Sequence, residues 1–553
     1  MDEKELVTSV SPTVAAVPKV EPSTVKRDDD LTDWIATGAD ARLAIEHEHQ
    51  MTIFDALRKY PKSCFWSMAI SLTIIMDGYD GALLGSLAAF PSFKQNFGHY
   101  KNAKSGYQID AQWQLALGCS SAIGNIVGIF CGAITTDRFG YKKSILLWLG
   151  LLSAFISISF FASSIAIIFA GEVLSGTSWG VFAVTAPIYA SEVCPVVLRP
   201  ILEVFVVMCW GFGQLLSYSV LLTLNKNTSN WGWRIPFAIQ WVFPAIIIPL
   251  VLFAPESPWW LVRKGRHADA EKVIKRLTNR LSEEQVRNAV SLMIETNQIE
   301  KDCHEGVGYL DCFRGDNLWR TEITCVAWAA QLGCGFVIAS YSTYFFQQAG
   351  LSSKDSYKMS VGQGGLHLLF NLISIPVVSR FGRRRLYLVG LAAMGTCMSI
   401  IGFIALAPQN KAVGFASSTI FLLWNCCYQL SVGPCAYILV SEVSSTRLRA
   451  KSVALGRISY LLCILVNYFV GPYILNPNEG NWKGKTGFLT AGVIVVLWMW
   501  SWFRLPETKG RTFAELDVLF SKGLKAREFE KYEVEIIGHG EDGKTTYSHI
   551  ETK

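Results

Sequence analysis

The sequence predicts an all-α membrane protein in which twelve spanning helices form two pseudo-symmetric halves of six. Hydrophobic residues make up 51% of the 553 residues and charged residues only 17%, whereas a soluble protein carries about 25% charged residues. The apolar residues gather in runs of about 20, the length that crosses a bilayer core about 30 Å thick. Short motifs also recur at matching positions in the two halves of the chain. These observations exclude an ordinary soluble domain.

Twelve apolar runs predict the spanning helices, and a polar segment separates the first six from the last six. The predicted spans are 64–87, 113–134, 144–163, 165–188, 202–224, 234–254, 323–347, 358–378, 385–407, 412–440, 451–472 and 485–503. The polar segment contains the helical patterns DAEKVIKRL and SEEQVRNAVSLMIE, so we expect an ordered helical linker.

These spans divide the chain into five regions. We expect an N-terminal tail over 1–62, a first half over 63–254, a linker over 255–322, a second half over 323–503 and a C-terminal tail over 504–553. The first 50 residues are polar and lack the apolar core of a signal peptide. They predict disorder, as do the residues after about Lys522.

Basic residues set the expected orientation, because Lys and Arg favour cytoplasmic loops. They cluster in the even-numbered loops as Arg138, Lys142, Lys143, Arg380, Arg383, Arg384, Arg385, Arg447, Arg449 and Lys451. We therefore expect a multi-pass cell-membrane protein whose linker and two termini are cytoplasmic. Asn227 then lies in an external loop as a possible glycosylation acceptor. The 14 cysteines lie mostly in apolar runs, which favours packing roles over disulfides or metal ligands.

Two motifs are repeated between the halves. TTDRFGYKK (135–143) after the second span is answered by VSRFGRRR (378–385) after the eighth. YASEVCPVVLR (189–199) after the fourth span is answered by LVSEVSSTRLR (439–449) after the tenth. Equivalent motifs at equivalent places indicate a pseudo-twofold repeat, the architecture of carriers whose halves rock about a central site.

Three further motifs complete a family resemblance. They are PESPWWLVRKGR (255–266), PETKGRTFAELDVLF (506–520) and WRIPFAIQW (233–241). With the four loop motifs, they make the chain resemble a sugar porter of the major facilitator superfamily from the first span to about Phe520. It is most similar to fungal maltose/α-glucoside permeases, which share stretches like QIDAQWQLALGCSS (108–121) and YSTYFFQQAG (341–350).

The resemblance implies a cytoplasmic gate that latches the halves together in the outward-facing state. Its residues here are Asp137, Arg138, Glu192, Arg199, Arg383, Glu442 and Arg449, with Asp137–Arg138, Glu192–Arg199 and Glu442–Arg449 as the expected pairs. The alternative is that these charges only signal topology, because isolated exposed pairs are worth about 0–1 kcal/mol. The chain departs from the family pattern at Ala133, Tyr141 and Ser379, so the second-half latch is expected to be weaker than the first.

Ionisable residues inside spanning helices are candidates for function. They are Asp77, Asp80, Glu172, His367 and Arg457, with Glu203 nearer the cytoplasmic face. The resemblance implies that Asp80 couples protons, and that an arginine usually stands where this chain has Glu172. We therefore hypothesise that Asp77, Asp80, Glu172 and Arg457 converge on one cavity in which an acid keeps a proton. Alternatively, Asp77 and Asp80 only line water.

Sugar binding calls for neutral polar groups and aromatic faces. By resemblance, Gln214 and Gln331 contact sugar hydroxyls, and Leu332 replaces a second glutamine of hexose porters. Further candidates are Gln363, Asn371, Trp424, Asn425 and Gln429. For Trp424, core packing is an equal alternative. Asn125 stands where several α-glucoside permeases have an acid.

The predicted function is proton-coupled symport of a maltose-like α-glucoside by alternating access, with protons, the sugar and the bilayer as partners and a monomer as the working unit. The alternatives are a proton-independent sugar facilitator and a non-transporting sugar sensor. No nucleophile–base motif, phosphate-binding loop or metal-ligand spacing supports an enzyme or a cofactor, and nothing indicates nucleic-acid binding. Pocket shape decides which glycoside is carried.

Overall fold

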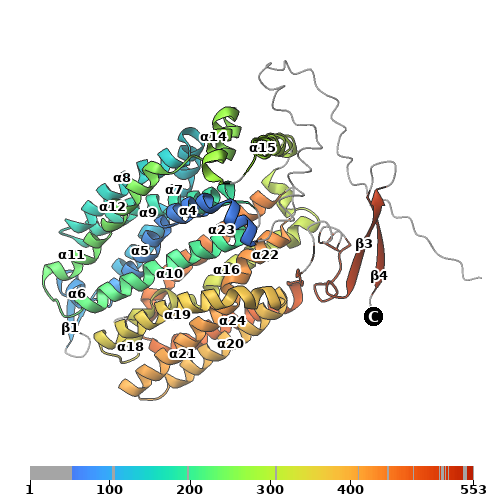
Figure 1. Ribbon diagram of the computed structural model, residues 1–553. Helices are drawn as coiled ribbons and strands as arrows, with labels where there is room; N and C mark the ends of the chain where they lie inside the picture. Colours follow the sequence, from blue (N-terminus) through green and yellow to red (C-terminus); the bar gives the residue numbers. More distant parts are fainter. Residues whose placement is uncertain are drawn as a thin grey trace, which may run out of the picture.

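The computed structural model describes residues 53–551 except 103–105, 196–197, 280, 305–307, 409, 445–447, 477–478, 510, 512–515, 517–518, 521 and 540–544. Most of the predicted N-terminal tail therefore lies outside the described residues. The described helices form two bundles that lie side by side (Figure 1).

The first half contains ten helices and a small hairpin among its described residues. They are α3 (Ile53–Lys59), α4 (Pro61–Ser71), α5 (Thr73–Leu87), α6 (Pro91–Phe97), β1 (His99–Asn102), β2 (Gly106–Gln108), α7 (Ala111–Phe139), α8 (Tyr141–Phe160), α9 (Ile165–Val193), α10 (Arg199–Leu224), α11 (Asn230–Ile239) and α12 (Val242–Phe253). The strands β1 and β2 pair antiparallel in the connection between the first two spans.

The linker and the second half follow. The linker holds α13 (Pro258–Arg263), α14 (His267–Leu277), α15 (Glu283–His304) and the 3₁₀ helix η2 (Tyr309–Phe313). The second half holds α16 (Asp316–Gly333), α17 (Phe336–Ser340), α18 (Ser342–Gln348), α19 (Ser353–Arg380), α20 (Arg383–Ile404), α21 (Lys411–Leu430), α22 (Val432–Val443), α23 (Arg449–Leu475), η3 (Lys483–Lys485) and α24 (Thr486–Arg504).

Nine helices in the described ranges are long and apolar enough to cross a membrane. The predicted first, seventh and tenth spans are absent from these nine, and each is divided into separate helices. The tenth breaks at Ser431, whose φ of −128° and ψ of −91° are not helical. Pro434 follows in the first turn of α22, where its missing N–H leaves no unpaired donor. Such breaks are tolerated where protein, not lipid, surrounds the backbone.

Helix packing repeats between the halves. In the first half α5 packs on α10 and α7 packs on α9; in the second, α16 packs on α23 and α19 packs on α21. The halves meet along α10 with α19 and along α7 with α23, which are also equivalent pairs. This arrangement agrees with the two pseudo-symmetric six-helix halves that the sequence predicts.

Glycines bring α7 and α9 into backbone contact. A Cβ at Gly128 would lie 2.0 Å from the Thr177 carbonyl oxygen, and one at Gly180 would lie 2.2 Å from that of Asn125. Small residues allow this close approach between membrane helices. The contact fixes the position of α9, which carries Glu172, relative to the rest of the half.

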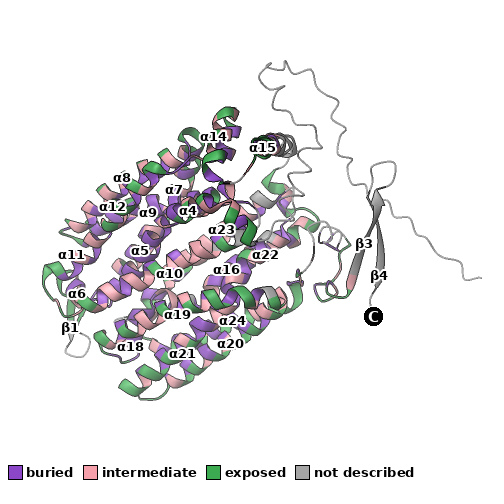
Figure 2. Cartoon of the chain, in the orientation of Figure 1, coloured by how far each residue is buried: buried purple, intermediate pink, exposed green. Residues whose placement is uncertain are grey.

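The two ends of the molecule differ. The helices α14 and α15 lie at one end, which we call the linker end, and α6 and β1 lie at the other, which we call the hairpin end (Figure 1). Buried residues follow the inward faces of the helices and exposed ones follow the outer faces (Figure 2). Exposed apolar side chains such as Phe130, Ile134 and Phe403, each at least 65% exposed, suit contact with lipid.

The C-terminal segment is more ordered than the sequence predicts. The rings of Phe520 and Phe529 pack edge-on against Trp319 on α16, and β3 (Tyr532–His539) pairs antiparallel with β4 (Thr545–Glu551). The prediction of disorder after about Lys522 therefore differs from the structure, because it rested on polar composition and missed these aromatic anchors. Likewise, α3 lies within the predicted N-terminal tail.

Candidate functional site

Asp80 lies in the interior of the first half with only 1% of its surface exposed. Trp179 Nε1, from α9, donates to Asp80 Oδ2 at 3.2 Å. Gln240 Nε2, from the interruption between α11 and α12, donates to Asp80 Oδ1 at 2.8 Å. Three separate spans therefore position this carboxyl group. The sequence analysis missed both donors, although Gln240 lies within the WRIPFAIQW motif.

Glu172 is the neighbour of Asp80 and is equally buried at 1% exposed. Its Oε1 accepts a hydrogen bond from Ser159 Oγ at 3.0 Å. The carboxyl groups of Glu172 and Asp80 lie within hydrogen-bonding contact of each other, yet no N–H or hydroxyl group among the described residues donates to Glu172 Oε2. This arrangement leaves one buried carboxyl oxygen of the pair without a donor among the described residues.

Asp77 connects that pair electrostatically to Arg457 in the second half. Asp80 and Arg457 both lie within electrostatic reach of Asp77, and the Trp210 side chain lies near it. The Arg457 guanidinium lies 5.2 Å from the Trp328 ring centroid and 4.6 Å from that of Tyr460. Within the described part of the chain, Arg457 forms no direct ion pair. The four residues are thus linked in the order Glu172, Asp80, Asp77 and Arg457, with the first two in contact and the others at longer electrostatic range.

Four of the predicted sugar-binding residues are engaged within the second half. Gln331 Nε2 donates to the Gly433 carbonyl at 2.9 Å, just after the break in the tenth span. Trp424 Nε1 donates to the Cys334 carbonyl at 3.1 Å, and its ring stacks on its neighbours at interplanar angles of 17° and 18°. These contacts join the interruptions of the seventh and tenth spans.

The other two engaged residues contact α19. The amide nitrogen of Gln429 lies 3.0 Å from His367 Nδ1, and Asn425 Nδ2 donates to the Gln363 carbonyl at 3.4 Å. Both pairs join α21 to α19.

Three predicted sugar-binding residues keep unpaired polar atoms. Gln363 Oε1 and Asn371 Nδ2 are buried without a partner among the described residues. Gln214, on α10, is half-buried and no described group hydrogen-bonds to its side chain. Neutral amides with unused donors and acceptors suit the hydroxyl groups of a sugar.

At the linker end of the first half, two carboxylates organise a polar cluster. Glu192 accepts hydrogen bonds from Arg263 Nη2 at 2.7 Å, from the Tyr141 hydroxyl at 3.0 Å and from the Ser257 hydroxyl. Glu256 accepts from the Tyr141 backbone N–H at 2.8 Å and so caps α8. Burial raises the pKa of the Glu256 carboxyl despite these donors. We call these five residues the first-half cluster.

The second half repeats this arrangement. Glu442 accepts from Arg383 Nη2 at 3.0 Å and from Thr508 Oγ1 at 2.5 Å. Glu507 accepts from the backbone N–H of Arg383 at 2.8 Å and caps α20. We call these four residues the second-half cluster. Its members occupy the places that Glu192, Tyr141, Ser257 and Glu256 hold in the first half.

The predicted gate pairs have other partners in the structure. Asp137 pairs with Lys264 at 3.0 Å, whereas the Arg138 guanidinium lies over the Phe139 ring. Glu192 and Glu442 pair with Arg263 and Arg383, as described above. The side chains of Arg199 and Arg449 lie outside the described residues, so their predicted pairs stay predictions.

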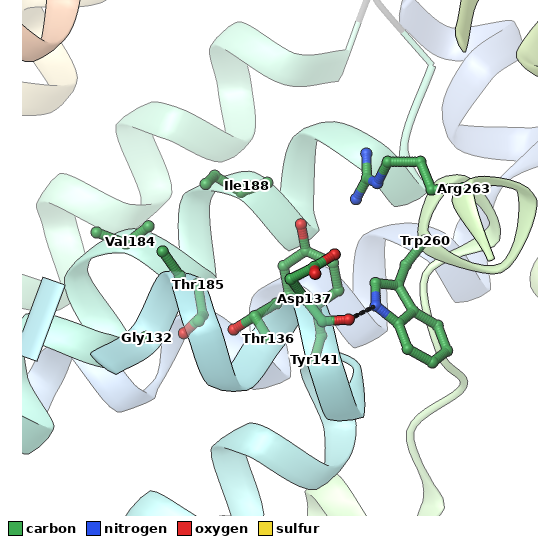
Figure 3. Close-up of a pocket in the computed structure, with 10 residues that line it drawn as sticks. Gly132, Thr136, Asp137, Tyr141, Val184, Thr185, Ile188, Trp260 and Arg263 are labelled. Carbon is green, nitrogen blue, oxygen red and sulfur yellow. Dashed lines mark hydrogen bonds between the residues drawn. The ribbon is translucent and has the colours of Figure 1, made fainter. Parts of the chain in front are cut away.

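A pocket of about 170 Å³ lies beside the first-half cluster, between the linker ends of α7 and α9. Thr136, Asp137, Tyr141, Thr185 and Arg263 are among the side chains that line it (Figure 3). Trp260 closes one side, and its Nε1 donates to the Asp137 carbonyl at 2.9 Å (Figure 3). The pocket therefore sits where spanning helices of the first half meet the linker.

The described hydrogen bonds between the two halves lie at the hairpin end. Their partners are Ser86 with Thr343, Ser86 with Tyr357, Ala89 with Gln347, Lys94 with Gln347, Asn225 with Ser353 and Ile109 with Asn476. These bonds hold the two halves together at the hairpin end.

Comparison with known proteins places this architecture in a family. The family model described as "Sugar (and other) transporter" matches residues 66–520. The chain belongs to this family. A general α-glucoside permease of Saccharomyces cerevisiae is 37% identical over 507 residues, which are 91% of this chain and 82% of that one. A maltose permease of the same yeast is 35% identical over 503 residues, 90% of this chain and 82% of the relative.

Solved structures agree with the fold. The xylose transporter XylE of E. coli, in a partially occluded inward-open conformation, superposes with a TM-score of 0.67 at 21% identity, covering 81% of this chain and 99% of that one. The protein is therefore a multi-pass membrane transporter with the twelve-helix fold of the major facilitator superfamily. It is a sugar transporter by family and not an enzyme, as the sequence predicts.

Proposed function

We propose that this protein is a plasma-membrane symporter that couples proton entry to uptake of an α-glucoside disaccharide such as maltose. The relatives named α-glucoside and maltose permeases support this substrate class. The basic loops of the linker end support a cytoplasmic position for that end, because Lys and Arg favour the cytoplasmic side. The hairpin end then faces outside, and the protein works as a monomer.

The buried contact between Asp80 and Glu172 carries the proposal. Two carboxylates in contact, with no cation of the described residues in an ion pair with either, repel each other strongly when both are ionised. The pair therefore holds a proton between the two groups, as coupled acids do. That proton supplies the donor that Glu172 Oε2 otherwise lacks. Trp179, Gln240 and Ser159 are neutral donors, so they orient the pair without neutralising it.

A transport cycle follows from this arrangement. With the hairpin end open, the pair takes a proton from outside; with the linker end open, it releases the proton inside. Asp77 and Arg457 face each other across the halves, so proton exchange near Asp77 changes the attraction between the halves. This contact ties protonation to the rocking motion that alternating access requires.

The sugar binds between the halves. Gln214 contributes from the first half, and Gln363 and Asn371 contribute from the second, because these amides keep unused polar atoms. Trp424 and Gln331 hold the interrupted spans in place behind them. Neutral amides match an uncharged saccharide, and contributions from both halves allow sugar binding to draw the halves together.

The test is uptake in yeast cells that lack their own α-glucoside transporters. Maltose, trehalose, sucrose and glucose are added separately while the external pH is recorded. We expect maltose to enter and to make the medium more alkaline, and glucose to do neither. Maltose uptake that persists with a protonophore would instead favour the facilitator.

Variants of the acid pair sharpen this test. Asp80→Asn and Glu172→Gln should each abolish maltose-dependent alkalinisation while exchange of labelled for unlabelled maltose continues. Glu283→Gln, which changes an acid that is 84% exposed on the linker, is the matched control and should behave as the parent. Alkalinisation in the Asp80→Asn protein would contradict the assignment of this pair.

A further inference from the structure

A lysine crosses between the halves at the closed hairpin end. Lys94 lies on α6 in the first half, and its Nζ donates to Gln347 Oε1 in the second half at 3.2 Å. The same ammonium lies 5.8 Å from the Tyr344 ring centroid. Gln347 is itself held, because its Nε2 donates to the Ala89 carbonyl at 2.9 Å and to Ser353 Oγ at 3.2 Å. The Lys94 contact is thus made only when this end is closed.

The groups around this ammonium are neutral. In the part of the chain that the structure describes, Lys94 has no carboxylate partner, and burial lowers its pKa to about 8. The nearby lysines of the second half differ, because Lys358 and Lys411 lie 3.6 Å and 3.5 Å from the carboxylate of Asp355. A charge that loses water without gaining a counter-charge raises the free energy of the state that buries it.

We propose that Lys94 is a positioning residue whose burial makes the closed state of the hairpin end less stable. The empty carrier therefore returns to the state in which the hairpin end is open. Opening separates Lys94 from Gln347 and returns the ammonium to water, which recovers its hydration energy. The hydrogen bonds of Gln347, Ser86 and Tyr357 supply the opposing attraction that closes this end. The balance between them sets how long the carrier stays closed.

The proposal predicts a definite sign for substitution. Lys94→Met keeps the length of the side chain and removes the charge, so closure should become more favourable. The purified full chain is placed in lipid nanodiscs, where both ends meet solvent. The probe is a bulky water-soluble maleimide that reacts with a cysteine introduced by Ala89→Cys, which keeps the backbone carbonyl that accepts from Gln347. Ala89 is only 1% exposed in the closed state, so its reaction reports opening.

We expect Lys94→Met to slow labelling by about tenfold and Lys94→Arg to leave it unchanged. Lys358→Met is the matched control, because it removes an exposed lysine at the same end. Labelling of the parent without the introduced cysteine is subtracted throughout. Faster labelling of Lys94→Met would show that Lys94 is a simple latch, and unchanged labelling would show no role; either result overturns the proposal. The labelling measurement needs no sugar and no assumed orientation in the membrane. Its outcome therefore tests the role of Lys94 independently of the proposed symport.

Discussion

The first-half and second-half clusters are built alike but obtain their positive charge from different parts of the chain. In the second half, Arg383 of the spanning helix α20 both receives the cap from Glu507 and pairs with Glu442. In the first half the equivalent residue is Tyr141, which donates only a neutral hydroxyl to Glu192. The cation there is Arg263, at the end of the linker helix α13.

This difference shows that the linker supplies the paired cation in the first-half cluster, whereas α20 supplies it in the second-half cluster. This chain has Tyr141 where the family usually has a basic residue. Arg263 of the linker pairs with the carboxylate of Glu192, to which Tyr141 donates. Any movement of α13 therefore changes the first-half cluster directly. The second-half cluster takes its cation from within the bundle and does not depend on the linker in this way.

The largest effect should come from Arg383→Ala. Among the described residues, Arg383 is the cation paired with Glu442, whose side chain is 22% exposed, and its removal leaves Thr508 as the described donor. We expect a loss of about 2 kcal/mol in stability, the range for hydrogen bonds to charged groups. Thermal unfolding of the purified protein in detergent measures it. The neighbouring Arg385→Ala, at an exposed position, is the control; an equal loss there would mean that net charge, not the pair, is responsible.

Arg263→Ala should cost less, about 1 kcal/mol, because Tyr141 and Ser257 still donate to Glu192 and Arg263 is 36% exposed. The double variant Tyr141→Arg with Arg263→Ala sharpens the comparison. It moves the cation to the position that Arg383 holds in the second half, so stability should return close to the parent value. If the double variant is less stable than Arg263→Ala alone, the two clusters are not equivalent.

Lys264→Ala should have the smallest effect. The side chains of Lys264 and Asp137, which form an ion pair, are 36% and 71% exposed, and exposed ion pairs contribute about 0–1 kcal/mol. We expect a change within about 0.5 kcal/mol by the same unfolding measurement. A loss as large as that of Arg383→Ala would indicate that the pocket beside Asp137 bears on stability.

Hydropathy predicted the spans well because it counts apolar residues along a run, and spanning helices need such runs. It treated the seventh and tenth spans as single helices because counting does not register where hydrogen bonding stops. Ser431 followed by Gly433-Pro434 is the local signal that marks the break in the tenth span. The C-terminal strands were missed for a related reason, since composition alone described that segment.

The candidate site was predicted only in part. Asp80 and Glu172 were expected to meet, and they do. Arg457 was expected to balance the acids because charge counting requires a cation; it lies within electrostatic reach of Asp77, and its guanidinium also lies near the rings of Trp328 and Tyr460. Gln240 and Trp179 were missed because hydrogen-bond partners depend on which faces of distant helices meet. Sequence spacing within one helix does not contain that information.

The buried acids of the first span have a consequence for how the chain enters the membrane. The first span carries Asp77 and Asp80, and an acid at the centre of a spanning helix costs about 2.5–3.5 kcal/mol during insertion. Gln240 and Trp179, which satisfy Asp80, belong to spans that are synthesised later. We therefore expect the first span to remain with the insertion machinery until the sixth has emerged. Biogenesis of this half would then proceed as a single unit and not helix by helix.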